Sequence, residues 1–238
     1  MLAGLLLVVV LGLAATMKSG NMLMSWRDTH TPAYALMLFI MWWTMMLAMM
    51  LPSAAPAILT FGSLSRRFSE KGVAAAPISA FTAGYLAIWT GFSAAAAALQ
   101  LLTQDLVPLT GMMAVTSSII GGALLLAAGI YQVSSFKSAC LRKCQSPLMF
   151  FARNWRKGYA GAFRMGLDHG AYCLGCCWVL MGLLFYGGVM ELTWIIGLAI
   201  YVAAEKLLPA GPWLSRGSAL VLIGWGLWVL AGAVQSAA

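Results

Sequence analysis

Long apolar runs separated by short polar stretches constrain this chain more than any other feature of its sequence. Only 8% of the residues are charged and 62% are hydrophobic, whereas soluble domains carry about 25% charged residues. With so few charges the chain lacks the polar side chains that a surface in water requires. The pattern predicts an all-α, polytopic transmembrane helix bundle that forms one domain over residues 1–238.

The length of the chain limits the number of spans. A membrane-spanning helix takes about 20 residues, so a chain of 238 residues has room for about seven spans, or six if the first apolar segment is not a full span. The spans are expected at residues 2–15, 33–51, 76–101, 112–133, 162–186, 192–208 and 218–235. Pro52 and Pro56 are expected to end or kink the second span. Gly84 and Gly91 suit close packing of the third span against a neighbouring helix.

The basic residues predict the orientation of the bundle. If loops alternate between the two sides of a membrane, Lys18 and Arg27 fall on one side, and the other 12 of the 14 basic residues fall on the opposite side. The larger group consists of Arg66, Arg67, Lys71, Lys137, Arg142, Lys143, Arg153, Arg156, Lys157, Arg164, Lys206 and Arg216. Cytoplasmic loops carry such an excess of Lys and Arg. We therefore expect an inner-membrane protein with a cytoplasmic N-terminus and a periplasmic C-terminus.

Two polar segments separate these spans on the predicted cytoplasmic side. Residues 61–72 are expected to form a loop or a short interfacial helix. Residues 134–160 mix apolar and basic side chains and are expected to form an interfacial cytoplasmic loop. The basic residues that give the net charge of +8 lie between the apolar runs. This placement favours membrane lipid as the partner and argues against nucleic acid.

The fifth predicted span contains an unusual density of soft ligands. It holds three of the five cysteines and one of the two histidines, and ligating side chains are rare inside membrane spans without a function. The histidine and two of the cysteines follow the i, i+4, i+7 spacing of one helical face, with the third cysteine adjoining. They are His169, Cys173, Cys176 and Cys177. Asp168 is expected to orient the imidazole.

A second pair of cysteines precedes this span. Cys140 and Cys144 are four residues apart, so both thiols face the same side of a helix. Neighbouring Lys and Arg side chains favour the thiolate form that binds metals. The predicted topology places this pair at the same membrane depth as His169 and Cys173, so four or five soft ligands are expected to meet there. The redox state of the Cys140 and Cys144 pair stays open.

Thiolate and imidazole together select the metal. They suit Cu(I) first and Zn(II) second, and they do not suit Mg(II) or Ca(II). The spacing matches no iron–sulfur motif. The alternative for the same cysteines is packing, because Cys also serves as a small apolar residue at helix contacts.

Methionines in the second predicted span are a further soft-ligand pattern. Met41, Met45 and Met49 repeat at four residues and form one stripe, and thioethers bind Cu(I). Such a stripe could carry a soft metal through the membrane. Packing is the more common role of methionine stripes.

The remaining charged motif closes the sixth predicted span. Glu205 and Lys206 are expected to be a solvated helix end, with pairing of Glu205 to Arg164 or Lys137 inside the bundle as the alternative. The chain has no Ser/His/Asp arrangement, phosphate-binding glycine loop or paired catalytic carboxylates. An enzymatic function therefore has little support.

Four motifs in matching order carry a resemblance to a known family. They are Met45-Met-Leu-Ala-Met-Met-Leu-Pro52, Cys140-Leu-Arg-Lys-Cys144, His169-Gly-Ala-Tyr-Cys173-Leu-Gly-Cys176-Cys177 and Glu205-Lys206-Leu-Leu-Pro209. Over roughly residues 35–230 the chain resembles a bacterial family of uncharacterised integral membrane proteins described as predicted metal-binding. The resemblance implies a helical fold in the bacterial inner membrane. It also implies a metal site at Cys140, Cys144, His169, Cys173, Cys176 and Cys177.

Three hypotheses about function follow. The first is a non-enzymatic membrane protein that binds Cu(I) or Zn(II) near the cytoplasmic face and handles the metal for a membrane metalloenzyme, by delivery, storage or sensing. The second is a non-catalytic accessory subunit of a large respiratory, photosynthetic or copper-oxygenase complex, in which the cysteines are packing residues and other subunits are the partners. The third and weakest is a metal transporter that uses the methionine stripe.

Overall fold

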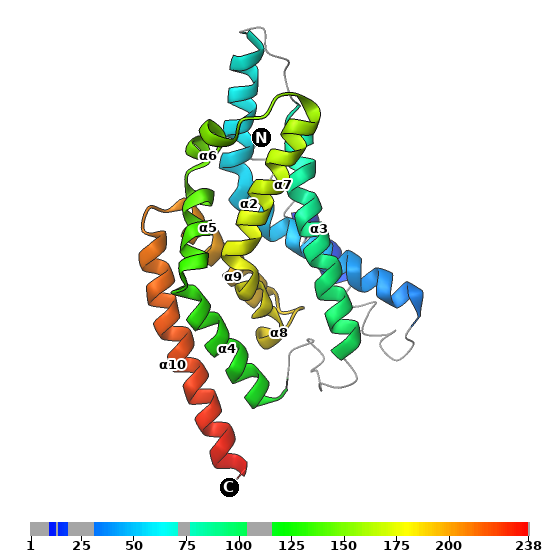
Figure 1. Ribbon diagram of the computed structural model, residues 1–238. Helices are drawn as coiled ribbons and strands as arrows, with labels where there is room; N and C mark the ends of the chain where they lie inside the picture. The colour runs from blue at the N-terminus through cyan, green and yellow to red at the C-terminus, as the bar shows by residue number, and fades with distance from the viewer. Residues whose placement is uncertain (1–9, 13, 19–30, 71–76, 104–115, 238) are drawn as a thin grey trace.

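The computed structural model describes residues 10–12, 14–18, 31–70, 77–103 and 116–237. Within these ranges every regular element is a helix (Figure 1), so the predicted all-α class is confirmed. The helices beyond residue 31 are α2 Pro32–Glu70, α3 Ile78–Thr103, α4 Ser118–Gln132, α5 Ser135–Gln145, α6 Pro147–Asn154, α7 Gly158–Gly182, α8 Leu184–Gly187, α9 Leu192–Leu207 and α10 Gly211–Ala237.

The number of helices that could cross a membrane is smaller than predicted. In the described residues four segments are long and apolar enough, namely α2, α3, α7 with α8, and α10. A fifth exists if α4 and α5, which meet at 63°, form one broken span. The expectation of about seven spans is therefore wrong by this measure. Helix α9 has only 16 residues, fewer than the roughly 20 that a span needs, and most of the first expected span, 2–15, lies outside the described residues.

Helix α2 is kinked and does not end at Pro52 and Pro56, so the second of the two expected outcomes is confirmed (Figure 1). It is a single helix of 39 residues with Pro52 and Pro56 inside it, and Figure 1 shows that it changes direction partway along. A proline inside a helix removes one backbone hydrogen bond and bends the helix without having to end it. The part after the prolines is held by packing, because the Phe61 ring stacks on Phe81 of α3 with centroids 4.8 Å apart. Residues 61–70 are thus helical, so of the two expectations for this segment the helix is confirmed and the loop is wrong.

Close approach of glycine backbones joins α3 to α7. A Cβ atom added to Gly166 would lie 2.0 Å from the carbonyl oxygen of Phe81, and one added to Gly84 would lie 2.1 Å from that of Phe163. Only glycine fits at such distances, as at the small-residue contacts of membrane helices. The expectation for Gly84 is confirmed, whereas a Cβ at Gly91 would meet no atom within 4 Å.

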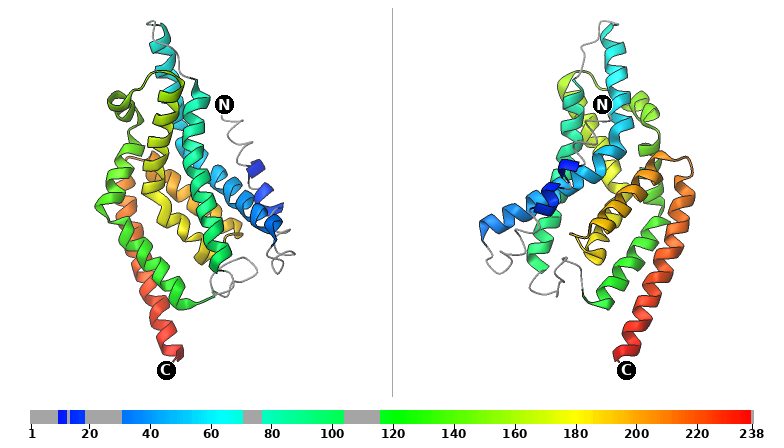
Figure 2. Two further views of the ribbon diagram at one scale, coloured as in Figure 1. Left: turned by 45° about the vertical axis from the view of Figure 1, so that its right-hand side comes forward. Right: turned by 180° about the vertical axis from the view of Figure 1, so that it is seen from behind.

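Helices α4 and α10 form a second close pair, seen side by side in Figure 2. A Cβ at Gly226 would lie 3.0 Å from the carbonyl oxygen of Gly122. Along the rest of its length α10 turns apolar side chains outward, including Leu220 and Trp228, which are 75% and 74% exposed. This pair therefore buries one narrow face and leaves a broad apolar face uncovered.

Residues 134–160 hold two helices where a loop is expected. Helix α5 begins after Ser134, whose hydroxyl accepts a hydrogen bond from the backbone N–H of Lys137 and caps the helix. It then packs along α7 and buries Lys137, Cys140 and Leu141. Helix α6 follows at the end of the molecule where α7 begins, while α8 and the end of α10 lie at the opposite end (Figure 1). Helix α5 thereby brings its cysteines and Lys137 into the centre of the bundle.

Candidate metal centre

Helix α7 positions most of the expected ligands. His169, Cys173, Cys176 and Cys177 are all buried, because they lie on the faces of α7 that meet the neighbouring helices. Their spacing of three or four residues matches the helical period and keeps them on one side. The helices that pack against α7 are α3, α4, α5, α8 and α9.

Four of the five cysteines form a ring of interacting thiols. The side chain of Cys144 on α5 lies close to those of Cys173 and Cys176 on α7. The side chain of Cys177 lies close to the same two residues. The ring thus joins two helices that are separated by a loop and by α6. None of the five cysteines is in a disulfide.

Within α7 two of these thiols share one acceptor. The thiol of Cys176 donates to the carbonyl oxygen of Cys173 at 3.1 Å, and the thiol of Cys177 donates to the same oxygen at 3.0 Å. Thiols are weak donors, so these hydrogen bonds orient the two side chains but are easily broken. A metal ion could therefore displace the thiol protons and bind either sulfur.

Cys173 is the sulfur with the most polar partners. Its Sγ lies 3.2 Å from the hydroxyl of Tyr85 on α3, and that hydroxyl also donates to the carbonyl oxygen of Met50 at 3.1 Å. The Nζ of Lys206 donates to the same sulfur at 2.9 Å. An ammonium at this distance favours the thiolate form of a cysteine. Cys173 is thus the cysteine of the ring with the nearest cationic partner.

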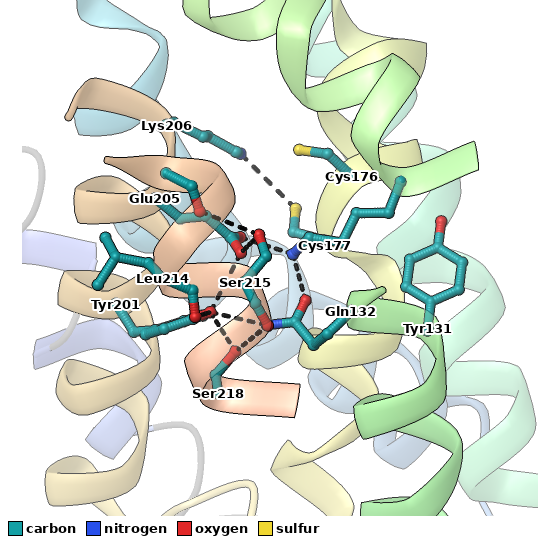
Figure 3. A network of polar contacts seen from close by, with 12 residues as sticks. Tyr131, Gln132, Cys176, Cys177, Tyr201, Glu205, Lys206, Leu214, Ser215 and Ser218 are labelled. Carbon is teal, nitrogen blue, oxygen red and sulfur yellow. Dashed lines mark hydrogen bonds and ion pairs between the residues drawn. The ribbon is translucent and has the colours of Figure 1, made fainter. Parts of the chain in front are cut away.

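Lys206 lies among three sulfur atoms. Besides Cys173, its Nζ lies 3.6 Å from Sγ of Cys177 and 3.8 Å from Sδ of Met50. Figure 3 shows the side chain pointing from α9 toward Cys177. Lys206 is only 4% exposed, and buried lysines are rare unless they are paired. Its buried partners are sulfur atoms.

The preceding residue, Glu205, faces a different set of groups. Its Oε2 accepts from Nζ of Lys137 at 2.6 Å, with both side chains fully buried. Its Oε1 accepts from the hydroxyl of Ser215 at 2.5 Å and from that of Tyr201 at 3.1 Å. The alternative of a buried pair between Glu205 and Lys137 is therefore correct, and the expected solvated helix end is wrong.

Gln132 completes this buried polar network, which Figure 3 draws. Its side-chain oxygen accepts from Lys137. Its amide nitrogen donates to the hydroxyls of Tyr201 at 2.7 Å and Ser218 at 2.6 Å. Each charged group in the network has hydrogen-bonding partners, as a buried ion pair requires. Four helices, α4, α5, α9 and α10, are joined here beside the thiol ring.

Two of the expected ligands lie outside the ring. Cys140 packs against α7 at Gly175, where an added Cβ would lie 2.9 Å from its sulfur, and none of its described contacts is with another thiol. The imidazole of His169 is surrounded by the aromatic side chains of Phe81, Tyr85 and Phe150. Its buried Nδ1 has no hydrogen-bonding partner. The structure therefore brings together four of the six expected ligands.

Asp168 does not orient the imidazole as expected. Its carboxylate lies 3.6 Å from the guanidinium of Arg156, and both side chains are about two-fifths exposed, at 39% and 41%. The carboxylate therefore points to the surface, away from the buried face that holds His169.

The methionine stripe is buried in the core. Met41, Met45 and Met49 are at most 2% exposed, and none of their described contacts is with the thiol ring. Met49 instead lines an apolar groove of about 220 Å³ between α2 and α9. Met50, one residue on, is the methionine whose sulfur reaches Lys206.

Three residues of the site were missed by sequence reasoning: Met50, Tyr85 and Lys206. Met50 follows Met49 directly and therefore lies on a neighbouring face of the helix, outside the predicted stripe. Lys206 could have been found from the sequence, because ionisable residues at the end of an apolar run are costly to bury. Where they are buried, they usually belong to a functional site. Tyr85 carried none, because a tyrosine in an apolar span is usually a packing or interface residue.

The donor set fits a soft monovalent ion better than a divalent one. In the part of the chain that the structure describes, no three His, Cys, Asp or Glu side chains converge as ligands around one point. The thiols contact each other in pairs around the ring, and the Lys206 ammonium lies beside Cys173 and Cys177. Zn(II) takes four convergent ligands in structural sites. Thiolate and thioether sulfurs select Cu(I), which accepts fewer ligands.

Comparison with known proteins identifies the family. No curated protein and no solved structure matches the chain. A family model described as "PpoB2: Copper chaperone" matches residues 39–229. The match begins within α2, ends within α10 and includes all five cysteines. The predicted metal-binding family is thus borne out at the level of copper handling, and the chain belongs to the PpoB2 copper chaperone family.

Proposed function

We propose that the chain is an integral membrane copper chaperone that holds Cu(I) at the thiol ring and passes it to a membrane metalloenzyme. Cys173 and Cys177 are the first ligands, and Met50 is the thioether beside them. Cys144 and Cys176 complete the ring and offer alternative thiols during transfer. The observation that carries the proposal is the proximity of the sulfur atoms of Cys173, Cys177 and Met50 around Lys206, with Cys144 and Cys176 beside them.

The chemistry of the donors supports Cu(I) over Zn(II). Every donor in the ring is sulfur, and soft sulfur ligands select Cu(I). The nearest imidazole, that of His169, has aromatic neighbours. A chaperone must also release its cargo, and a ring of thiols that interact in pairs offers a series of exchangeable ligands. Copper can move between thiols without ever being free.

Membrane insertion is supported by the surface of the molecule. Only 11% of the most apolar window of α10 is buried inside the structure. Outward-facing residues of that helix, such as Leu220, Val221 and Trp228, are large and apolar. A soluble monomer rarely exposes so large an apolar surface. We propose that this surface faces lipid in the bacterial inner membrane, with the ends of α2 and α5 toward the cytoplasm, as the basic residues predict.

Copper binding to detergent-purified protein under reducing conditions tests the proposal. The measurement is Cu(I) stoichiometry and affinity in competition with a chromogenic Cu(I) chelator. We expect one tightly held Cu(I) in the parent and loss of that binding in Cys173→Ser and Cys177→Ser variants. Cys140→Ser is the matched control, because Cys140 is a buried cysteine of α5 outside the ring, and it is expected to keep the parent affinity.

Two results would contradict the proposal. One is equal copper binding by the parent and the Cys173→Ser and Cys177→Ser variants. The other is a complete absence of Cu(I) from the folded parent, together with copurification of other subunits in gentle detergent, which would support the accessory-subunit hypothesis. Copper flux into proteoliposomes that needs Met41, Met45 and Met49 would support the transporter hypothesis.

A further inference from the structure

We infer that Lys206 is the resident counter-cation of the copper centre and makes the site selective for monovalent soft ions. The inference rests on the proposed function, since it concerns the same thiols. It assigns a specificity-determining role to a residue that binds no metal itself. The role follows from where the ammonium lies, what surrounds it and how the charges add.

The position of the ammonium is the first argument. Its Nζ lies 2.9 Å from Cys173, 3.6 Å from Cys177 and 3.8 Å from Met50. These are the sulfurs proposed to hold Cu(I). The Lys206 ammonium is therefore a cation that the chain itself supplies to this place. Its flexible four-carbon stem lets the ammonium withdraw slightly and still donate to the sulfurs once a metal lies between them.

The second argument is that Lys206 is committed to these sulfurs. The neighbouring carboxylate of Glu205 is occupied by Lys137, Ser215 and Tyr201. Among the residues that the structure describes, no carboxylate lies within ion-pair distance of Lys206. A buried ammonium without an anionic partner is strongly unfavourable. The thiolates of the ring are the anions that this lysine can have.

The third argument is the sum of the charges. Two thiolates and one Cu(I) carry a net charge of minus one, which the Lys206 ammonium cancels. Two thiolates and one Zn(II) are already neutral, so the ammonium leaves an excess positive charge in a buried site. Uncompensated charge is costly in a low-dielectric interior. The same lysine thus favours the monovalent complex and disfavours the divalent one.

A charge-removing substitution tests the inference through the ratio of two affinities. We expect Lys206→Gln to weaken binding of Cu(I) and of Ag(I) by about tenfold or more, while Zn(II) binding stays equal or becomes tighter. Lys206→Arg keeps the charge and is expected to keep the preference of the parent. Lys157→Gln, which changes an exposed lysine just before α7, is the control for a general loss of positive charge.

Other outcomes separate this inference from the proposed function. If Lys206→Gln binds Cu(I) as tightly as the parent or more tightly, Lys206 is a mere occupant and the inference is overturned. If affinities for Cu(I) and Zn(II) fall by the same factor, its role is structural and the inference is again overturned. Lys206→Leu repeats the test should the glutamine variant fold poorly. A parent protein that binds no Cu(I) overturns the proposed function itself.

Discussion

Two buried lysines lie close together in this bundle and have opposite surroundings. Lys137 of α5 is paired with a carboxylate at 2.6 Å and is part of a network in which the charged groups are hydrogen-bonded. Lys206 of α9 is surrounded by sulfur. Glu205, the partner of Lys137, and Lys206 itself are consecutive residues that project from α9 about 100° apart. Glu205 therefore meets Lys137 of α5, whereas Lys206 meets the sulfur atoms of α7. One turn of helix thus serves two different centres.

The difference separates a structural charge from a functional one. A carboxylate at neutral pH is a permanent anion, so its pairing with Lys137 holds the helices together regardless of any ligand. A cysteine in water is mostly a neutral thiol at that pH, and its anionic form is favoured by a nearby cation. The pairing of Lys206 with thiols is therefore conditional, which suits a site that must accept and release a metal.

The largest effect is expected at the structural pair. Lys137→Met leaves the carboxylate of Glu205 buried without its cation, and we expect the free energy of unfolding to fall by about 3–5 kcal/mol. Chemical unfolding in mild detergent, followed by loss of helicity, measures this change. Adding Glu205→Gln to the variant should recover part of the loss. Equal stability of the parent and the Lys137 variant would remove the distinction between the two lysines.

An intermediate effect is expected where α3 sets the position of Tyr85 against Cys173. Gly166→Ala places a methyl group against the backbone of Phe81, so the helices must separate at a cost of about 1–3 kcal/mol. Copper affinity is expected to fall as well, because Tyr85 moves with α3. Gly91→Ala is the control, since its Cβ would meet open space. If Gly166→Ala and Gly91→Ala lost copper affinity and stability to the same extent, the close packing of α3 on α7 would not be what positions Tyr85 against Cys173.

The smallest effect on stability is expected at the functional lysine. Lys206→Gln allows Cys173 to become a neutral thiol, so the free energy of unfolding without metal should change by about 1 kcal/mol or less. The measurement is the same unfolding experiment on metal-free protein. A loss as large as that of Lys137→Met would show that both lysines are structural, whatever the metal affinities are.

The fold was predictable from the sequence where the local pattern of apolar residues is enough to define a helix. Apolar runs and the helical period gave α3, α7, α9 and α10 to within a few residues at most ends, and Gly84 marked a close contact. A kink in α2 was predictable from Pro52 and Pro56, but the continuation of the helix to Glu70 was not. The backbone bonds lost at the prolines are outweighed by aromatic packing around Phe61. That packing involves residues remote in sequence, which no local pattern reports.

The site was predictable in its chemistry and less so in its membership. The spacing on α7 and the pair on α5 correctly brought Cys144 next to Cys173 and Cys176. Cys140 lies one turn earlier on α5, and it packs against Gly175 of α7 instead of another thiol. Lys206 was misplaced because a charged pair at a helix end is usually solvated. Its burial depends on α9 being short and enclosed, which is a property of the whole bundle.

The thiols of Cys176 and Cys177 both donate to the carbonyl oxygen of Cys173, and these hydrogen bonds make their S–H vibrations a spectroscopic label of the ring. The S–H stretching vibration absorbs in a region of the infrared spectrum where proteins are otherwise transparent, and its frequency shifts when the thiol is hydrogen-bonded. Loading with copper should therefore bleach the band of Cys177 and leave that of Cys140 in place. The occupancy of each thiol can then be followed in an intact membrane, without a dye or a substitution.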